Sequence, residues 1–406
     1  MIYKLNFREV VYALSEALDL VGIDDIYHGK RVAFMAAECA STAGYDEEFI
    51  NELIYLGMLH DCGVSTTDMH RNLVTKLEWK DESIHCERGY MLLQKTKLFE
   101  KYADVIYYHH THWEDLKNIH IDEKIKIQAN LIYLVDRVDA LRAQIDLPPE
   151  QMKDEIYRII LEHKDTLFSA ELIESFLQAS RKASFWFFLE DDALEEYLYE
   201  WKDMGGVYGY TYEELREIAV MFADIVDTKS PFTAQHSFGV ASLSLYLGRK
   251  AGLDKSSLET LELAALLHDL GKLRIDDEVL NKPGKLNVDE RLLLNRHGFD
   301  SDLILRKIKG FRKIAHLASL HHETLDGEGY PYRLKSADIP LEARIIAVSD
   351  IFQALIQNRP YREAMSAEKA FEILSDMAES GKLDKEVIGL MQENLEEVYN
   401  KAVVPV

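Results

Sequence analysis

A spaced set of histidines and aspartates occurs twice in this chain of 406 residues and constrains its fold more than any other feature. Each half carries, in order, a histidine, a His-Asp pair, a histidine, a His-His pair and an aspartate. The first histidine lies 32 residues before the His-Asp pair in both halves, and the third lies 24 residues before the His-His pair in both. Corresponding residues of the two copies are 208 positions apart at the start of the series and 214 apart at its end. Matched gaps over more than a hundred positions predict two homologous domains. The residues are His28, His60, Asp61, His85, His109, His110 and Asp136 in the first half, and His236, His268, Asp269, His297, His321, His322 and Asp350 in the second.

The segments between these residues predict helices. The chain has only 8 prolines and 20 glycines and no sustained alternation of apolar and polar residues. Residues 46–59 and 256–267 each start with polar residues, continue as an apolar run and end at a His-Asp pair, and Ser256 with Glu259 predicts a capping box. We therefore expect an all-α fold with two tandem helical domains, at 1–185 and 211–406. A linker at 186–210 joins them, with residues 185–201 as a connecting helix.

The composition predicts a cytoplasmic protein. Hydrophobic residues make up 47% and charged residues 29%, which is typical of globular proteins. No apolar run approaches the ~20 residues of a spanning helix, and polar residues interrupt the first ten positions, unlike a signal peptide. The three cysteines, Cys39, Cys62 and Cys86, are odd in number and form no Cys-x-x-Cys pair, so we expect free thiols in a reducing compartment.

The formal net charge of −24 argues against nucleic acid polymers and membranes as partners. An acidic protein offers no positive field to collect backbone or lipid phosphates. A small phosphate substrate is still compatible with this charge if metal ions and a few local cations bind it.

Residues 321–331 hold two adjacent imidazoles, three carboxylates, two glycines and a proline. Neighbouring side chains on a helix diverge by about 100°, so His321 and His322 suit two closely spaced ions better than one. Imidazole and carboxylate ligands fit iron, manganese, nickel or zinc. Two such ions bridged by an aspartate activate a shared water and polarise a phosphoryl group. The pattern thus predicts a phosphohydrolase centre with two divalent transition metal ions.

The second half resembles the HD-GYP subclass of the HD phosphohydrolases. The resemblance rests on a histidine, His-Asp-x-Gly-Lys, a histidine, His-His-Glu-x-x-Asp-Gly-x-Gly-Tyr-Pro, an aspartate and Arg-Pro-Tyr-Arg, and covers residues 211–379. The first half is similar to a plain HD domain. The resemblance implies a bacterial phosphodiesterase that opens cyclic dinucleotides, chiefly cyclic di-GMP, to the linear product at a site of two or three iron or manganese ions.

The resemblance also assigns roles to individual residues. Asp269 would bridge the ions, and Lys272 would meet the scissile phosphate and its developing charge. Tyr330 would border the substrate, while Arg359 and Arg362 would hold the second phosphate. The remaining metal ligands would be His236, His268, His297, His321, His322 and Asp350.

Three positions depart from the family pattern. Phe232 stands where members with three metals have glutamate, so we expect two ions. Gly239 replaces a common arginine, and Gln353 replaces a residue that is often acidic. These changes affect the expected base recognition, and the hybrid 3′,3′-cyclic GMP-AMP competes with cyclic di-GMP as the predicted substrate.

The first half keeps every ligand type and so is a second candidate metal site. It has Val64 where the second half has Lys272, and it lacks the Gly-Tyr-Pro loop and the Arg-Pro-Tyr-Arg run. Three interpretations stay open: a regulatory copy with or without metal, a phosphohydrolase for a smaller nucleotide such as the linear product, or vestigial histidines. Cys62 and Cys86 lie beside His60 and His85, where they are either redox sensors or small core residues.

Two alternative functions follow from the same residues. One is an HD-type nucleotidase that acts on smaller nucleotides, and the other is a non-catalytic receptor for a cyclic dinucleotide. A receptor would signal to a partner through the acidic surface or residues 185–201. A homodimer or a signalling protein is the expected protein partner.

Overall fold

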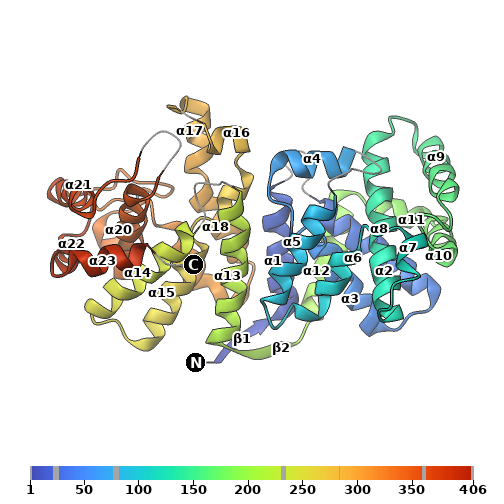
Figure 1. Cartoon of the computed structure of the whole chain (residues 1–406), viewed down its shortest axis with the longest axis horizontal. Coiled ribbons are helices and arrows are strands. Elements are labelled where there is room, and N and C mark those ends of the chain that lie inside the picture. Colours follow the sequence, from blue (N-terminus) through green and yellow to red (C-terminus); the bar gives the residue numbers. More distant parts are fainter. Residues whose placement is uncertain are drawn as a thin grey trace. The chain divides into compact units, whose positions relative to one another are not determined.

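The computed structural model describes residues 2–21, 27–75, 82–229, 235–282, 284–358 and 363–403, which are almost entirely helical (Figure 1). The all-α prediction is confirmed. The chain forms two compact units. The first unit is Leu14–Gly206, and the second combines Met1–Ala13 with Val207–Val406. In the described residues, no helix combines the length and the apolar character needed to cross a membrane.

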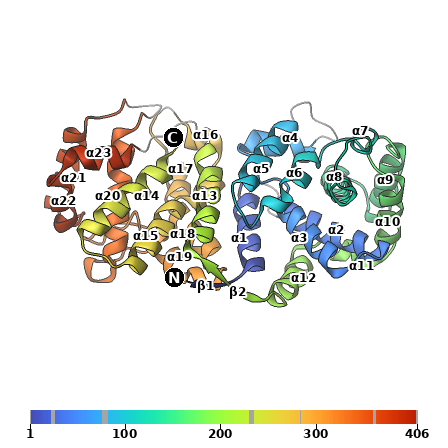
Figure 2. The same cartoon turned by 60° about the horizontal axis from the view of Figure 1, so that its bottom comes forward.

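The first unit is built around α8 (Glu123–Gln144), a buried helix of 22 residues. Helices α2, α4, α6 and α9 pack against it, and Figure 2 shows α8 almost end-on among its neighbours. The other elements are α1 (Phe7–Asp19), which begins in the second unit, α2 (His28–Ala43), α3 (Glu47–Leu59), α4 (Thr67–Thr75), α5 (Ser83–Gln94), η1 (Glu100–Tyr102), α6 (Ala103–Tyr108), α7 (Trp113–Leu116), α9 (Pro149–Glu162), α10 (Ala170–Ser180), α11 (Ala183–Phe187) and α12 (Asp191–Asp203).

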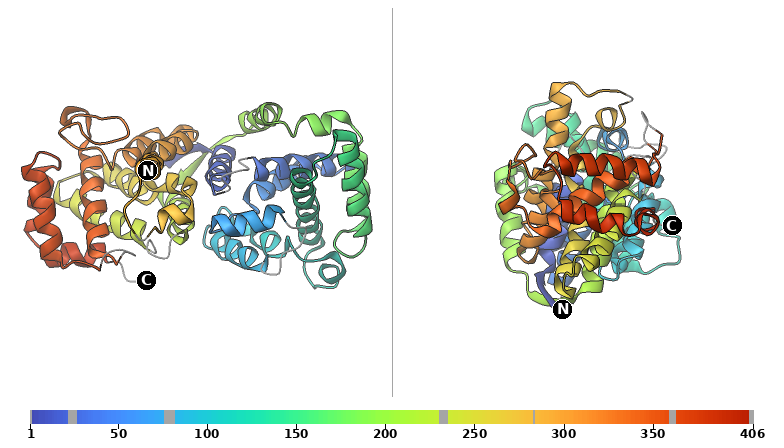
Figure 3. Two further views of the ribbon diagram at one scale, coloured as in Figure 1. Left: turned by 90° about the horizontal axis from the view of Figure 1, so that it is seen from above. Right: turned by 90° about the vertical axis from the view of Figure 1, so that its left-hand side faces the viewer.

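The second unit repeats this plan around α20 (Leu341–Ile356), which packs against α14, α15 and α21. Figure 3 shows α20 to α23 grouped at one end of this unit. Its other elements are β1 (Ile2–Asn6), β2 (Val207–Thr211), α13 (Tyr212–Thr228), α14 (His236–Lys250), α15 (Lys255–Leu267), η2 (Leu270–Arg274), α16 (Asp277–Leu280), α17 (Val288–Asn295), α18 (His297–Leu305), η3 (Lys309–Phe311), α19 (Arg312–Ser319), η4 (Ser336–Asp338), α21 (Ala367–Glu379), α22 (Lys385–Gln392) and α23 (Leu395–Ala402).

Two local predictions differ from the structure. The N-cap of α15 is Asp254, whose carboxylate accepts a hydrogen bond from the Ser257 amide at 2.8 Å, so the expected capping box of Ser256 and Glu259 is wrong. Asp254 caps the helix because it lies one residue before the first helical residue and has the extended backbone that an N-cap requires. Residues 185–201 form the two helices α11 and α12 instead of one, and both pack within the first unit.

A two-stranded ribbon joins the start of the chain to its middle. Strands β1 and β2 are antiparallel, with Ile2 opposite Thr211 and Asn6 opposite Val207. Sequence periodicity did not indicate this ribbon, because five-residue strands give a weak pattern and their pairing spans about two hundred residues. The ribbon places residues 1–13 with the second unit, whereas the predicted domain boundary assigned them to the first half.

Candidate active site

The predicted metal ligands of the second unit converge from four helix ends and one helix interior. His236 begins α14, His268 and Asp269 follow α15, His297 begins α18, His321 and His322 follow α19, and Asp350 lies within α20. His236 Nε2 is 3.2 Å from Asp350 Oδ1 and 3.5 Å from Asp269 Oδ2. His268 Nε2 is 3.3 Å from the same Asp269 oxygen. These four side chains form the first ligand group.

A second ligand group lies on the other side of Asp269. His297 Nε2 and His321 Nε2 are 2.9 Å apart, and Asp269 Oδ1 lies 3.5 and 3.7 Å from them. His322 joins this group, with its ligand atom within 4.8 Å of those of His297 and His321. The two oxygens of Asp269 therefore face different ligand groups, which is the arrangement that a bridging carboxylate needs.

Backbone and side-chain acceptors fix the orientation of the imidazoles. The Nδ1 atoms of His268, His297 and His321 donate to the carbonyl oxygens three residues earlier, at 2.5–2.7 Å. His236 Nδ1 instead donates to Gln353 Oε1 at 2.6 Å. Hydrogen bonds of this kind point the Nε2 atoms toward the centre and leave them unprotonated, so that they can bind a metal ion.

The donor atoms fit divalent transition metals. His236 Nε2, His268 Nε2 and Asp269 Oδ1 are buried and have no hydrogen-bond partner. Buried polar atoms without partners are costly in a folded protein unless a ligand satisfies them. Imidazoles and carboxylates of this number and spacing suit a pair of such ions.

The protonation states of these groups suit the same role. Burial lowers the pKa of His297 to about 3 and that of His322 to about 4, which leaves both rings neutral near pH 7. Burial alone would raise the pKa of Asp269, but His268 and Lys272 outweigh it and hold that pKa well below its usual range. His297 and His322 are therefore neutral imidazoles beside an ionised Asp269, while the same aspartate outweighs burial and raises the pKa of His268.

Lys272 lies at the centre, beside Asp269. Its Nζ donates to Asp269 Oδ2 at 2.5 Å, and its side chain is partly exposed. The turn that carries it is held by Ser301, whose hydroxyl accepts from the Gly271 amide and donates to the His268 carbonyl. Lys272 thus provides a positive charge on the accessible side of the aspartate.

Tyr330 also lies at the centre, on a loop that a buried carboxylate holds in place. The Tyr330 ring packs against His322 with centroids 4.8 Å apart. Glu323 is 4% exposed and accepts hydrogen bonds from the amides of Tyr332 at 2.6 Å and Leu334 at 2.9 Å. Sequence reasoning missed this role of Glu323. The available signal was an acid directly after the His-His pair and before a glycine-rich loop.

The two described departures from the family pattern lie behind His236. Gln353 holds its Nδ1 atom, and Gly239 leaves room for the end of α23, since a Cβ there would lie 2.4 Å from the Ala402 carbonyl oxygen. Gln353 thus contacts a predicted metal ligand, and Gly239 lies in the packed interface of α14 with α23. Phe232, Arg359 and Arg362 lie outside the described residues.

The first unit reproduces the first ligand group closely. His28 Nε2 is 3.2 Å from Asp136 Oδ1 and 3.8 Å from Asp61 Oδ2, while His60 Nε2 is 3.5 Å from the same Asp61 oxygen. His28 Nδ1 donates to Asp139 Oδ2 at 2.9 Å. Four of the seven candidate ligands of the first half thus lie together in the same arrangement.

The remaining positions of the first unit differ. His85 Nε2 and His109 Nε2 are 3.1 Å apart, but the third residue grouped with them is Cys86 and not His110. Val64 is a buried apolar residue where the second unit has Lys272. All three cysteines are buried, and burial raises the pKa of each thiol, so these residues lack the exposed thiolate of a typical redox sensor.

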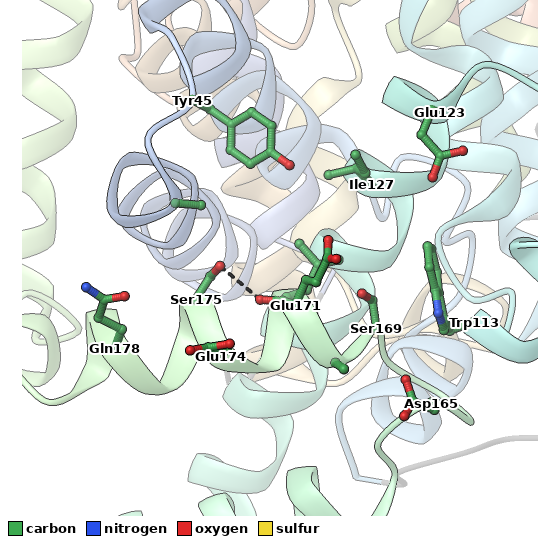
Figure 4. Close-up of a pocket in the computed structure, with 13 residues that line it drawn as sticks. Tyr45, Trp113, Glu123, Ile127, Asp165, Ser169, Glu171, Glu174, Ser175 and Gln178 are labelled. Atoms are coloured by element: carbon green, nitrogen blue, oxygen red, sulfur yellow. Dashed lines mark hydrogen bonds between the residues drawn. The ribbon is translucent and has the colours of Figure 1, made fainter.

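A cavity of about 560 Å³ in the first unit is separate from both histidine clusters (Figure 4). Helix α10 forms one wall with Glu171, Glu174 and Gln178, and Tyr45 and Trp113 line other sides. Its lining includes none of the fourteen predicted ligands, so we assign it no part in the chemistry of either cluster.

Comparison with known proteins places the chain in a family. The family model described as HD domain matches residues 25–141, and a second model of the same description matches residues 220–387. The 3′3′-cGAMP-specific phosphodiesterase 1 of Vibrio cholerae serotype O1 is 36% identical over 412 residues, which cover 99% of this chain and 94% of that protein. This chain belongs to the HD-GYP phosphodiesterases of the HD-domain family.

Other relatives match a smaller share of this chain. The cyclic di-GMP phosphodiesterase response regulator RpfG of Xanthomonas campestris pv. campestris is 37% identical over 173 residues, or 42% of this chain and 45% of that protein.

A solved structure described as a cyclic GMP-AMP specific phosphodiesterase of V. cholerae, V-cGAP3, covers 100% of this chain and 99% of its own with a TM-score of 0.65. At 23% identity that structure supports the fold alone.

Proposed function

We propose that this chain is a metal-dependent phosphodiesterase that hydrolyses a cyclic dinucleotide to the linear dinucleotide in its second unit. The observation that carries the proposal is Asp269, whose two carboxylate oxygens face two different sets of histidines. Divalent ions held there would activate a water near neutral pH and neutralise phosphoryl oxygens. The reaction adds one water to a phosphorus and releases the ribose 3′-oxygen as a hydroxyl.

The proposed roles of the side chains follow from their positions. His236, His268 and Asp350 would hold one ion and His297, His321 and His322 the other, with Asp269 between them. Lys272 would exchange its contact with Asp269 for the charge that develops on the scissile phosphate. Tyr330, packed on His322, would form a wall of the substrate site. Arg359 and Arg362 stay predicted ligands of the second phosphate.

We propose 3′,3′-cyclic GMP-AMP as the preferred substrate, with cyclic di-GMP as the competitor. A relative specific for 3′3′-cGAMP is 36% identical along nearly the whole chain, including the first half. Iron and manganese are the expected metals, and nickel and zinc fit the same ligands.

The nucleotidase and receptor alternatives are not needed to account for the second unit. The three interpretations of the first unit stay open here. The cytoplasmic location, the homodimer and a signalling-protein partner also stay predictions.

The test compares turnover of both cyclic dinucleotides by protein that is purified without oxygen and loaded with iron(II) or manganese(II). We expect cleavage of 3′,3′-cyclic GMP-AMP at a higher kcat/KM than cyclic di-GMP. Asp269→Ala should lower kcat at least 1,000-fold because it removes the carboxylate shared by both ligand groups. Asp61→Ala, the same change in the first unit, is the matched control and should leave ring opening within about threefold of the wild type.

Binding of the cyclic dinucleotides without turnover under any metal would contradict the proposal and favour a receptor. Equal losses in the two aspartate variants would contradict the assignment of the chemistry to the second unit.

A further inference from the structure

The two histidine clusters differ most in what surrounds the last aspartate of each set. In the second unit Asp350 is followed by Ile351. In the first unit Asp136 is followed by Arg137, which is 1% exposed and is among the largest fully buried side chains of the described residues. Its Nη2 and Nε donate to Asp136 Oδ2 at 2.7 and 3.2 Å. A buried guanidinium thus lies against a predicted metal ligand.

Both of these hydrogen bonds go to the same oxygen of Asp136. The other oxygen, Oδ1, lies 3.2 Å from His28 Nε2 and 4.0 Å from His60 Nε2, nearly as Asp350 Oδ1 lies from its two histidines at 3.2 and 3.9 Å. The first ligand group of the first unit is therefore intact. His60 Nε2 is buried and has no hydrogen-bond partner, and the same holds for both ring nitrogens of His110.

The second ligand group of the first unit is altered on the same side as Arg137. His110 Nε2 lies 3.6 Å from Asp136 Oδ2, the oxygen that Arg137 holds, and His110 Nδ1 lies 3.7 Å from Glu82. Cys86 Sγ lies 3.6 Å from His109 Nδ1, which the Ile106 carbonyl oxygen already binds at 2.6 Å, and 3.8 Å from His85 Nε2. A dication beside His110 would also face the buried guanidinium charge, which is costly where water is excluded.

The free space matches this asymmetry. A cavity of about 20 Å³ lies against His28, His60 and Asp61, and its lining includes neither Asp136 nor any of His85, His109 and His110. A cavity of that size holds about one water or one ion.

We propose that the first unit binds a single divalent ion, at His28, His60, Asp61 and Asp136, and that the Arg137 guanidinium takes the place of a second ion. Arg137 compensates the charge of Asp136 as the second ion would, but it is buried and provides no site for a water or a phosphate. This inference concerns the first unit and does not depend on the function proposed for the second.

The direct test is anomalous diffraction from crystals of the full chain loaded with manganese(II). We expect one peak among His28, His60, Asp61 and Asp136 and none between His85, His109 and His110. Two peaks in the first unit, or a peak at His85, Cys86 and His109, would overturn the proposal. So would the absence of any peak there while the second unit is occupied.

Metal content per chain gives an independent test. Asp61→Ala should lower the content by one ion, and Arg137→Ile, which installs the residue of the second unit, should raise it by one ion and restore a peak beside His110. Arg142→Ile is the matched control on the same helix, because Arg142 donates to Asp139, which is not a predicted ligand. Unchanged metal content in a folded Arg137→Ile variant would contradict the role of Arg137. If that variant does not fold, the peaks in the wild type still decide the proposal.

Discussion

At the residue scale, the centre of the second unit depends on groups that hold the proposed ligands. Three of its imidazoles donate to backbone carbonyls, and His236 donates to Gln353. The loop that carries Tyr330 depends in a similar way on Glu323, whose carboxylate accepts two backbone amides. These supporting groups set the positions of the imidazole nitrogens and of the Tyr330 ring without taking part in the chemistry.

Replacement of Glu323 tests this support. Glu323→Ala removes two charge-assisted hydrogen bonds, each of which contributes about 1.5–3 kcal/mol, so the free energy of unfolding of the second unit should fall by at least about 2 kcal/mol. KM for the cyclic dinucleotide should rise about tenfold because Tyr330 loses its fixed position, while metal content should not change. Chemical denaturation, steady-state kinetics and metal analysis measure these three quantities.

Glu328→Ala is the control, since Glu328 is an exposed acid of the same loop. Loss of metal from the Glu323 variant would show that the carboxylate supports the ligands themselves and not only the loop.

At the element scale, the ends of helices decide where the chemistry lies. His268 follows α15 and His321 follows α19, so the last turn of each helix supplies the carbonyl that orients the ring. Helix α23 packs against α14 at Gly239, where a Cβ would lie 2.4 Å from Ala402 O and 2.9 Å from Gln353 Cγ. The C-terminal helix therefore packs directly behind the His236–Gln353 pair.

Substitution of this glycine should disturb both packing and site. Gly239→Ala overpacks the contact of α14 with α23, and we expect a loss of about 1–3 kcal/mol in the free energy of unfolding together with weaker metal retention. Gly389→Ala in α22 is the matched control. A Cβ at Gly389 meets nothing within 4 Å, so the higher helix propensity of alanine should stabilise the protein by up to about 1 kcal/mol. Equal melting temperatures of the two variants would contradict this packing argument.

At the scale of the whole molecule, the chain makes two units of similar plan but different chemistry, and it returns its first strand to the second unit. Leu5 in β1 is 2% exposed, and Tyr3 donates to Glu259 at 3.3 Å. Glu9 binds the Lys309 amide at 3.0 Å. The N-terminal residues are thus part of the core of the unit that carries the proposed catalytic site.

The first strand should therefore stabilise the second unit specifically. Leu5→Ala should lower the free energy of unfolding of that unit by about 2–4 kcal/mol, because it deletes a buried side chain. Hydrogen exchange followed by mass spectrometry should show weaker protection in α20 and unchanged protection in α8. Ile2→Ala on the same strand, where the side chain is 63% exposed, should have little effect. Weaker protection of α8 alone would contradict the assignment of β1 to the second unit.

The sequence by itself determined the helical class, the two copies and the family. The reason is that metal-binding residue types recur in the same order and with the same spacing in both halves, and this can be read without knowing how the chain folds. It also pointed to the histidines and aspartates of both clusters, although Cys86 rather than His110 lies with His85 and His109. Only the tertiary structure decided what lies behind those side chains: Gln353 on His236, Glu323 under the loop, Arg137 on Asp136 and β1 on the second unit. Three of these contacts join residues distant in the chain or within an irregular loop, and the fourth depends on where a buried side chain points. No local periodicity encodes such contacts, so they required the packed molecule.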